Sequence, residues 1–377
     1  MLFFFAALVT SLVVTLLLVR GSRSSMKKFE GVSTHNKWMR DGTLRGLGRA
    51  GGAGVAAGLL ASLLARFTDH AGVAEFGLLL LTSSLPVLTA GMGEDLTRRV
   101  SATTRLFAAL FSAALAGWLL NAWIVRIDLP WVDGALALPV VSVMLTCFAV
   151  AGVTHAFNII DGFNGLAGGV AGLILLGLAY VAFKVGDIYV LAGAMTAIGA
   201  IAGFMFLNFP RGLVYLGDGG AYLVGFWIAE LSVLLVARNP EVSPWFPVLL
   251  CSYPIFETIF SIYRRTVVRR SHPGLPDLAH LHHLIYKRLV RWAVGSTLVS
   301  RRDQRNSLTS TYLWFLTSVC VVPAVAIWRF TTALQVCCAL FAIAYAYGYT
   351  RIARFRSPGW LVLHKKRDKH NDPPGDH

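Results

Sequence analysis

Long apolar stretches separated by short polar segments dominate the chain. A stretch of about 17 to 25 apolar residues can cross a hydrocarbon layer about 30 Å thick as a helix. The pattern predicts eleven such spans, at about residues 1–19, 50–66, 71–92, 104–125, 135–154, 166–185, 187–207, 219–237, 244–263, 309–328 and 331–350. The second and eighth are the least regular, because glycine and alanine dilute one and a Gly-Asp-Gly-Gly turn opens the other.

Composition supports a membrane protein. Of 377 residues, 56% are hydrophobic and only 14% are charged, and the mean hydropathy is +0.63. A soluble domain of ordinary composition is less apolar and more highly charged. We therefore predict an all-α polytopic membrane protein, with residues 1–350 as one integral-membrane domain and 351–377 as a basic tail that we expect to be disordered.

The distribution of positive charge predicts an orientation. The first segment lacks a positive n-region and a cleavage site, and its charges follow it, so we expect an uncleaved helix with its N-terminus outside. Eleven crossings then place 29 of the 34 Lys and Arg residues on the cytoplasmic side, as the positive-inside rule predicts. The net charge of +15 follows from this topology and from attraction to anionic lipids, and it does not indicate a nucleic-acid partner. The C-terminus and the loops at 20–49, 93–103, 155–165, 208–218 and 264–308 are then cytoplasmic.

Polar residues gather on that predicted cytoplasmic side. In the Gly-rich segment 155–169, Asn158, Asp161 and Asn164 stand three residues apart and would share one face of a helix. The same side carries further acids and histidines, at Glu94, Asp95, Asp218, His280, His282 and His283. A transporter would instead place ionisable groups near the midplane and expose residues to both faces in turn.

These residue types favour phosphoryl transfer. Glu94, Asp95, Asp161 and Asp218 would repel one another if gathered, unless a hard divalent cation lay among them. Oxygen ligands without cysteine favour Mg²⁺ or Mn²⁺ over zinc, and Mg²⁺ commonly completes its shell with substrate phosphates. Glycines beside Asp218 allow a polyphosphate to approach the backbone, and the histidines and nearby arginines provide groups for a phosphate or a sugar.

Each motif also has a simpler interpretation. The Glu94–Asp95 pair is compatible with a solvated helix end, Asp218 with an ordinary turn, and the histidines with a solvated basic loop. The Asn158 segment is the hardest to explain in this way, because polar side chains at a membrane boundary cost free energy unless they are satisfied.

In order along the chain, these motifs resemble the polyprenyl-phosphate N-acetylhexosamine-1-phosphate transferases of the MraY/WecA type, known as glycosyltransferase family 4. The family has an acidic pair after the third helix, an N-A-F-N-x-x-D-G-x-[DN]-G-L-x-x-G segment, a G-D-x-G segment and an H-x-H-H loop. The match covers about residues 35–290. The histidine loop, Pro254–Thr258 and Arg264-Arg265 are more similar to the bacterial WecA branch, which also has eleven helices.

The resemblance implies transfer of a sugar 1-phosphate, such as GlcNAc-1-phosphate, from a UDP-sugar to undecaprenyl phosphate, with release of UMP, at the cytoplasmic face of a bacterial inner membrane. It implies Mg²⁺ as cofactor and suggests a homodimer. The lipid phosphate would attack directly, although a covalent aspartyl intermediate stays open. The resemblance implies that Asp218 binds the metal and that Asn158 binds the metal or the diphosphate. It implies that Asp161 and Asn164 lie in the nucleotide pocket and that Glu94 and Asp95 contact the lipid phosphate. The residues implied at the sugar-phosphate end are His280, His282, His283, Arg264 and Arg265.

Several positions depart from the family pattern. Glu94 replaces an Asp, Asn164 stands where Asp is common, Glu257 replaces an Asp, and Leu278 stands where an Arg often precedes the histidine loop. A longer side chain at 94 displaces the carboxylate, so Asp95 is the stronger candidate for the base. These departures leave open another sugar and a catalytically silent scaffold. A polytopic transporter of an envelope precursor is a separate alternative.

Overall fold

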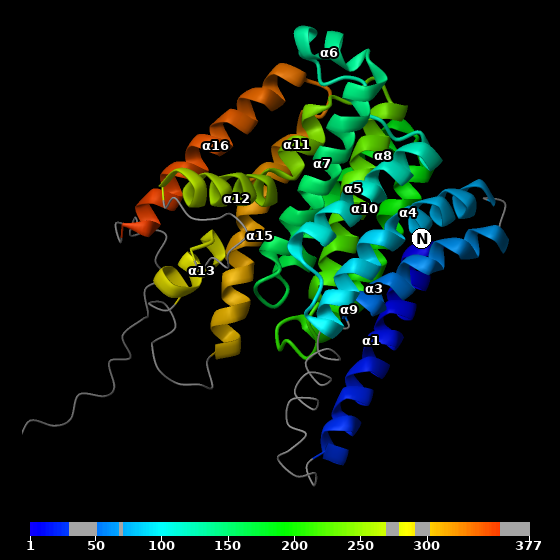
Figure 1. Ribbon diagram of the computed structural model, residues 1–377, viewed down its shortest axis with the longest axis vertical. Helices are drawn as coiled ribbons and strands as arrows, with labels where there is room; N and C mark the ends of the chain where they lie inside the picture. The colour runs from blue at the N-terminus through cyan, green and yellow to red at the C-terminus, as the bar shows by residue number, and fades with distance from the viewer. Residues whose placement is uncertain (30–50, 68–70, 269–278, 291–301, 355–377) are drawn as a thin grey trace, which may run out of the picture.

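The computed structural model describes residues 1–29, 51–67, 71–268, 279–290 and 302–354 (Figure 1). Within these ranges all regular structure is helical, which confirms the predicted all-α class. The long helices are α1 (Leu2–Phe29), α4 (Ala71–Thr97), α5 (Ala102–Leu120), α7 (Pro139–Ile160), α8 (Leu166–Val185), α9 (Ile188–Asn208), α10 (Gly217–Arg238), α15 (Arg302–Ala326) and α16 (Thr331–Ala353). The shorter ones are α3 (Gly51–Leu59), η2 (Leu60–Phe67), α6 (Pro130–Leu136), α11 (Trp245–Leu250), α12 (Ser252–Tyr263), η3 (Arg264–Val268), α13 (Leu281–Ile285) and η4 (Tyr286–Val290).

Nine helices in the described ranges are long and apolar enough to cross a membrane, and each coincides with a predicted span. The chain is therefore a multi-pass membrane protein. The two other predicted spans are divided. Residues 50–66 form α3 followed by the 3₁₀ helix η2, and residues 244–263 form α11 and α12 with a break at Cys251.

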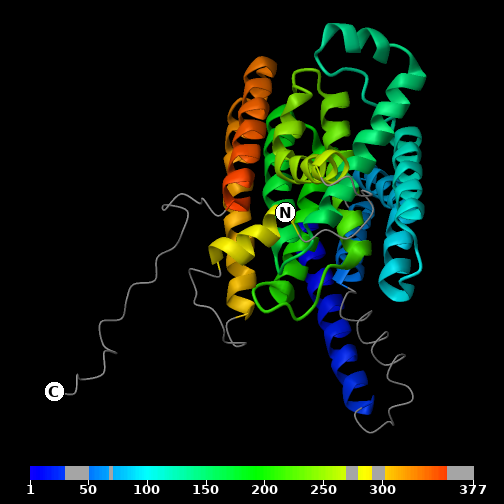
Figure 2. The same cartoon turned by 60° about the vertical axis from the view of Figure 1, so that its left-hand side comes forward.

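The break at Cys251 has a local cause. Pro254 has no N–H to donate to the carbonyl of Leu250, and its ring crowds that carbonyl, so proline favours a kink or break at this point. After the break, α12 crosses the long axes of its neighbours (Figures 1 and 2). This change of direction brings the end of α12 towards α16 and the histidine segment.

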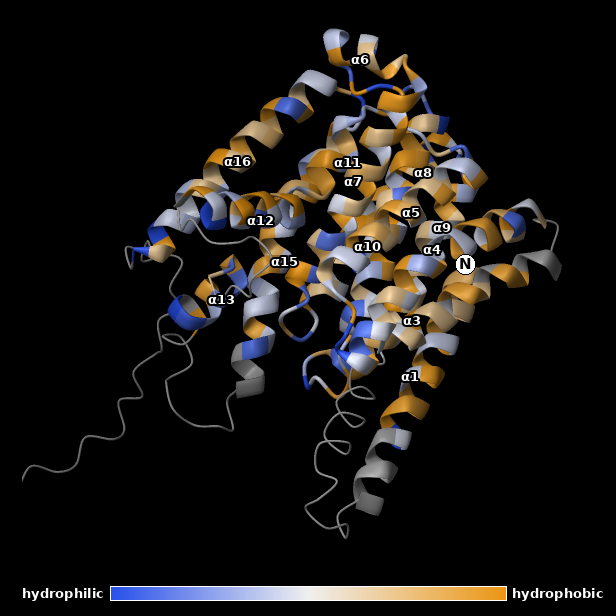
Figure 3. Ribbon diagram, viewed as in Figure 1, coloured by the Kyte–Doolittle hydropathy of each residue, from blue (hydrophilic) through white to orange (hydrophobic). Residues whose placement is uncertain are grey.

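The eighth predicted span, although irregular in sequence, is the core of the bundle. In an apolar 18-residue stretch of α10, 89% of the residues are buried. In the corresponding stretches of α1 and α16 the share is 22%. Helix α10 packs against α3, α4, α7 and α8, and small residues permit this close packing. A Cβ on Gly220 would lie 2.7 Å from the Cα of Gly52, and one on Gly225 would lie 2.9 Å from the Cα of Thr154. Figure 3 shows apolar residues over most of the bundle and polar residues concentrated near its lower end.

The predicted loops are shorter than the sequence indicated. Helix α1 runs to Phe29, α4 to Thr97, α7 to Ile160, and α15 already begins at Arg302. Backbone hydrogen bonds continue past the apolar stretches because helix formation does not require apolar side chains. Residues 351–353 of the predicted tail belong to α16 and Arg354 is its C-cap, whereas residues 355–377 lie outside the described residues. So do Leu278 and most of the predicted loop at 20–49.

Candidate active site

Asp95 joins the end of α4 to the start of α10. Its Oδ1 accepts a hydrogen bond from the backbone N–H of Asp218 (3.0 Å), and its Oδ2 accepts one from that of Gly219 (2.9 Å). The first N–H groups of a helix have no partner within the helix, and a carboxylate there is also favoured by the helix dipole. A Cβ on Gly91 would lie 2.6 Å from the Cα of Gly219, so glycine at 91 permits this approach. Asp95 therefore holds the backbone of Asp218 in place.

The side chain of Asp218 faces a cation. Its Oδ2 forms an ion pair with Nη1 of Arg105, at the beginning of α5. The Arg105 guanidinium lies 5.8 Å from the centre of the Tyr222 ring, and that ring makes an edge contact with His155 on α7, with 5.0 Å between centroids. We call Asp95, Arg105, His155, Asp218 and Tyr222 the acid group.

Three members of the acid group were not predicted from the sequence. Arg105 was counted only as one of the cytoplasmic cations, and His155 and Tyr222 were given no role. The spacing of Tyr222 was an available signal, because it stands four residues after Asp218 and therefore on the same face of α10. No comparable signal linked Arg105 to Asp218, 113 residues away.

The two acids of the Glu94–Asp95 pair have different surroundings. Oε2 of Glu94 accepts a hydrogen bond from the backbone N–H of Val100 (2.9 Å), and its carbonyl accepts one from Arg98 (2.8 Å). Glu94 thereby stabilises the turn between α4 and α5. Successive positions on a helix point about 100° apart, so adjacent acids contact different elements.

The Asn158 segment does not form one helical face, so that expectation is wrong. Asn158 lies in the last turn of α7, and Asp161 is the C-cap residue, with ψ of 57° outside the helical region. Gly165, with φ of +75°, adopts a conformation that favours glycine, and the next helix begins after it. The chain turns between these points, so Asn164 lies beyond the helix that carries Asn158.

Asn164 is almost completely buried, with 3% of its surface exposed. Its Nδ2 donates to the carbonyl of Pro210 (3.2 Å), and its backbone N–H donates to Oδ1 of Asn306 (2.8 Å). Its carbonyl accepts from the hydroxyl of Ser310 (2.7 Å). The structure thus places Asn164 between the α9–α10 connection and α15, where it joins these elements.

The histidine segment packs against the same turn. The Phe163 ring makes edge contacts with His282 and His283, each with 5.6 Å between centroids. The rings of His280 and His282 stack at 5.3 Å, and those of His282 and His283 lie 4.3 Å apart. A Cβ on Gly162 would lie 2.9 Å from Nε2 of His282. We call Phe163, His280, His282 and His283 the histidine group, in which the rings of His282 and His283 pack against Phe163 of the Asn158 segment.

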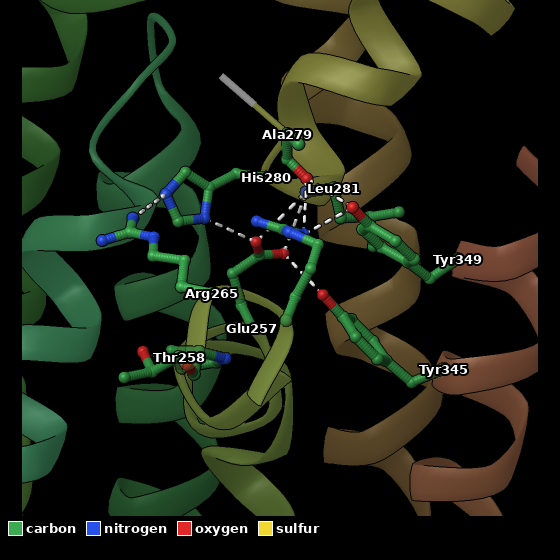
Figure 4. Close-up of polar contacts among 10 residues, drawn as sticks. Glu257, Thr258, Arg265, Ala279, His280, Leu281, Tyr345 and Tyr349 are labelled. Carbon is green, nitrogen blue, oxygen red and sulfur yellow. Dashed lines mark hydrogen bonds and ion pairs between the residues drawn. The ribbon is translucent and has the colours of Figure 1, made fainter. Parts of the chain in front are cut away.

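The two predicted arginines flank the histidine group. Arg264 is buried, and its Nη1 donates to the carbonyl of Ala279 (2.8 Å) and to the hydroxyl of Tyr349. Arg265 places Nη2 at 3.4 Å from Nε2 of His280 (Figure 4). Arg264 therefore fixes the backbone before the histidines, and Arg265 contacts the imidazole itself.

The four acids do not form the ready-made metal cluster that the sequence led us to expect. In the part of the chain that the structure describes, no three His, Cys, Asp or Glu side chains are arranged to hold a metal ion. Asp95 directs both oxygens at backbone N–H groups. Mg²⁺ usually takes only one or two protein carboxylates and completes its shell with water and substrate phosphates. Asp218, a partly exposed carboxylate, suits a site of that open kind.

Comparison with known proteins shows which family the sequence around this site resembles. Residues 77–236 match the sequence model of glycosyl transferase family 4. This match confirms the resemblance to glycosyltransferase family 4 that the sequence motifs indicated. The matched segment runs from α4 to α10, so it contains the complete acid group and the Asn158 segment.

Three bacterial proteins show how far the similarity extends. The chain is 34% identical to a "Probable undecaprenyl-phosphate N-acetylglucosaminyl 1-phosphate transferase" of Bacillus subtilis over 140 residues, 37% of this chain and 39% of the relative. It is 29% identical to an undecaprenyl-phosphate alpha-N-acetylglucosaminyl 1-phosphate transferase of Thermotoga maritima over 223 residues, 58% and 64% of the two chains. It is 27% identical to a protein of the same name from Yersinia pestis over 246 residues, 63% and 65%. In each case the match spans less than two thirds of the relative's length.

Proposed function

We propose that this protein transfers a sugar 1-phosphate, with GlcNAc-1-phosphate as the first candidate, from a UDP-sugar to undecaprenyl phosphate and releases UMP. The product would begin a lipid-linked envelope glycan. The observation that carries the proposal is the convergence of motifs that are distant in sequence. Asp95 binds the backbone at Asp218, and His282 and His283 pack on Phe163. The names of the relatives support the choice of lipid and sugar.

We further propose eleven crossings, with the N-terminus outside, the site on the cytoplasmic face of a bacterial inner membrane, and a homodimer. Nine long apolar helices and the one-sided distribution of Lys and Arg support the topology. In this arrangement α3 with η2, and α11 with α12, provide the two remaining crossings.

In the proposed reaction, a phosphate oxygen of the lipid attacks the β-phosphorus of the UDP-sugar in line. The bond between that phosphorus and the oxygen bridging to the α-phosphate breaks, and UMP leaves. Mg²⁺, or Mn²⁺, would be held by Asp218 with Asn158 and would neutralise charge on the diphosphate. Arg105, paired with Asp218, provides a fixed positive charge beside it. Positioning and charge stabilisation supply most of the rate in such transfers.

The hydrogen bonds of Asp95 favour a positioning role for this member of the acidic pair. Because both oxygens of Asp95 accept backbone N–H groups of α10, we assign Asp95 to positioning Asp218 rather than to proton abstraction. Asp161, at the end of α7, stays a candidate for the nucleotide pocket, and His282 and His283 for the sugar-phosphate end.

The test is turnover by the purified protein in lipid nanodiscs with undecaprenyl phosphate, Mg²⁺ and a panel of UDP-N-acetylhexosamines, scored by UMP release and lipid-linked product. Asp218→Asn should lower turnover by at least about 10³-fold, because it removes the ligand charge. Glu241→Gln, an exposed acid between α10 and α11, is the matched control and should behave as wild type. Normal turnover by Asp218→Asn would contradict the proposal, and an inactive wild-type protein would favour the scaffold alternative.

One observation bears on the transporter alternative. Glu230 lies fully buried within α10, and neither carboxylate oxygen has a hydrogen-bond partner. This acid was not predicted as a functional residue, although an ionisable group inside a membrane span often has a function. Transport would require solute counterflow in proteoliposomes that Glu230→Gln abolishes, whereas the transferase predicts no such flux.

A further inference from the structure

Glu257 on α12 forms a buried clamp on the histidine segment. Only 1% of its surface is exposed, and hydrogen-bond donors from two other elements converge on its carboxylate (Figure 4). Its Oε1 accepts from Nδ1 of His280 (2.9 Å), and its Oε2 accepts from the hydroxyl of Tyr345 on α16 (2.7 Å). The backbone N–H of Leu281 lies 3.1 and 3.2 Å from the two oxygens. These donors give both oxygens of the buried carboxylate hydrogen-bond partners.

This arrangement determines which nitrogen of His280 carries the proton. An ionised carboxylate can only accept, so Nδ1 of His280 is the donor towards Glu257. On the other side of the ring, Nη2 of Arg265 lies 3.4 Å from Nε2. A guanidinium can only donate, so Nε2 presents its lone pair to Arg265. Glu257 thus requires a proton on Nδ1 and Arg265 requires Nε2 without one, and together the two contacts favour the tautomer protonated on Nδ1.

The backbone on either side of His280 is held as well. Arg264 and Tyr349 both donate to the carbonyl of Ala279, each at 2.8 Å, and Glu257 accepts from Leu281. Neither the ring nor the main chain of His280 can rotate without breaking one of these bonds. Glu257, His280 and Arg265 therefore form a preorganised series of polar contacts, with the Arg265 guanidinium as its positively charged member.

We propose that Glu257 is a positioning residue that acts through His280 to orient the guanidinium of Arg265 towards the diphosphate of the UDP-sugar. The inference rests on the proposed transferase function and deepens it. His280 then serves as the hydrogen-bond acceptor that aims Arg265, while His282 and His283 lie nearer the Asn158 segment. Carboxylate partners of metal-binding histidines are typically worth about 10- to 100-fold in affinity or activity, and we expect an effect at the lower end of this range for His280.

The kinetic test is a double-mutant cycle. Glu257→Gln keeps the shape but replaces one acceptor with a donor, which favours the opposite tautomer and turns an N–H of His280 towards Arg265. We expect KM for the UDP-sugar to rise about 10-fold, with a smaller change in kcat. In an Arg265→Ala background the same change should alter KM less than about twofold, because the group it orients is absent. Equal effects of Glu257→Gln in the two backgrounds would overturn the proposal.

The structural test does not depend on turnover. In ¹⁵N-histidine-labelled protein in nanodiscs, the signal lost in His280→Ala identifies His280, and its shift should report the tautomer protonated on Nδ1. Glu257→Gln should move that signal, and Glu241→Gln should leave it unchanged. An unmoved His280 signal in Glu257→Gln would overturn this inference alone, whereas a wild-type protein without turnover would overturn the proposed function.

If Glu257→Gln does not fold, two further variants test whether the carboxylate acts through His280. Tyr345→Phe removes one donor but retains the carboxylate, so the His280 signal should persist and KM should rise less than about threefold. Glu257→Asp restores the charge with a shorter reach and should give a KM below that of Arg265→Ala. Loss of the tautomer signal in Tyr345→Phe, or a KM for Glu257→Asp equal to that of Arg265→Ala, would contradict a role of the carboxylate through His280.

Discussion

The acid group and the histidine group are built in different ways. In the acid group, a side chain of one long helix binds the backbone at the start of another, since Asp95 accepts from the N–H groups of Asp218 and Gly219. In the histidine group, short helical segments are held mainly by side chains, with Glu257 and Arg264 as the principal anchors. The first group thus shares the rigidity of the bundle core, whereas the second depends on individual hydrogen bonds from α12 and α16.

This difference predicts where substitutions affect catalysis and where they affect binding. Displacing α10 moves Asp218 itself, so errors in the acid group should lower kcat. Displacing the histidine segment leaves the core intact, so errors there should mainly raise KM. Three substitutions test this division, beyond those already described for Asp218 and Glu257.

The largest effect is expected from Asp95→Asn. An amide can accept only one of the two N–H bonds and directs its own N–H₂ at the other donor, so the start of α10 and Asp218 should shift. We expect kcat to fall about 100-fold, since a displacement of about 1 Å can have that cost. The free energy of unfolding should fall by about 1–2 kcal/mol.

Asp187 provides a matched control for Asp95. It caps α9 by accepting from the N–H groups of Tyr189 and Val190, and it lies at the other end of the bundle's helices, near Arg238. Asp187→Asn should lower thermal stability by a similar amount and leave kcat near the wild-type value. Equal losses of kcat in both variants would mean that Asp95 affects only folding.

An intermediate effect is expected from Gly162→Ala. The new Cβ would lie 2.9 Å from Nε2 of His282, closer than carbon and nitrogen normally approach, so the histidine group must move. We expect KM for the UDP-sugar to rise about fivefold with kcat little changed. Gly172→Ala on α8 is the control, because no atom outside its own helix lies within 4 Å of a Cβ there. A fall in kcat without a change in KM would contradict the division between the two groups.

The smallest effect is expected from Glu94→Gln. The amide oxygen can still accept from Val100, so the turn between α4 and α5 should persist. We expect kcat to fall less than about threefold in the same turnover assay. A loss of 10²-fold or more would instead identify Glu94 as the base that removes a proton from the lipid phosphate.

The sequence predicted much of this fold because hydrophobic spans leave a strong signal. Nine of the predicted spans coincide with long helices, and a lipid environment requires helices to satisfy their backbone hydrogen bonds internally. The division at Cys251 was not predicted, although Pro254 was visible, because α11 and α12 together are as apolar as a continuous span.

The roles of the candidate site residues stay predictions, and their arrangement was predicted only in part. The histidines and the Asn158 segment do meet. The predicted common face of Asn158 and Asn164 was wrong, because periodicity assumes that a helix continues, whereas α7 ends at Ile160 and Asn164 lies beyond it. Arg105 was missed because its pairing with Asp218 depends on how α5 packs beside α10, which no local pattern encodes.

By itself, the sequence determined that this chain is an all-helical membrane protein with acidic, amide and histidine side chains in its polar segments. Burial in lipid and residue chemistry are properties of local composition, so they can be read without coordinates. Only the tertiary structure decided which partner each side chain has. Asp95 became a helix cap and Glu257 a clamp on His280 because hydrogen bonds act over about 3 Å between elements that packing alone brings together.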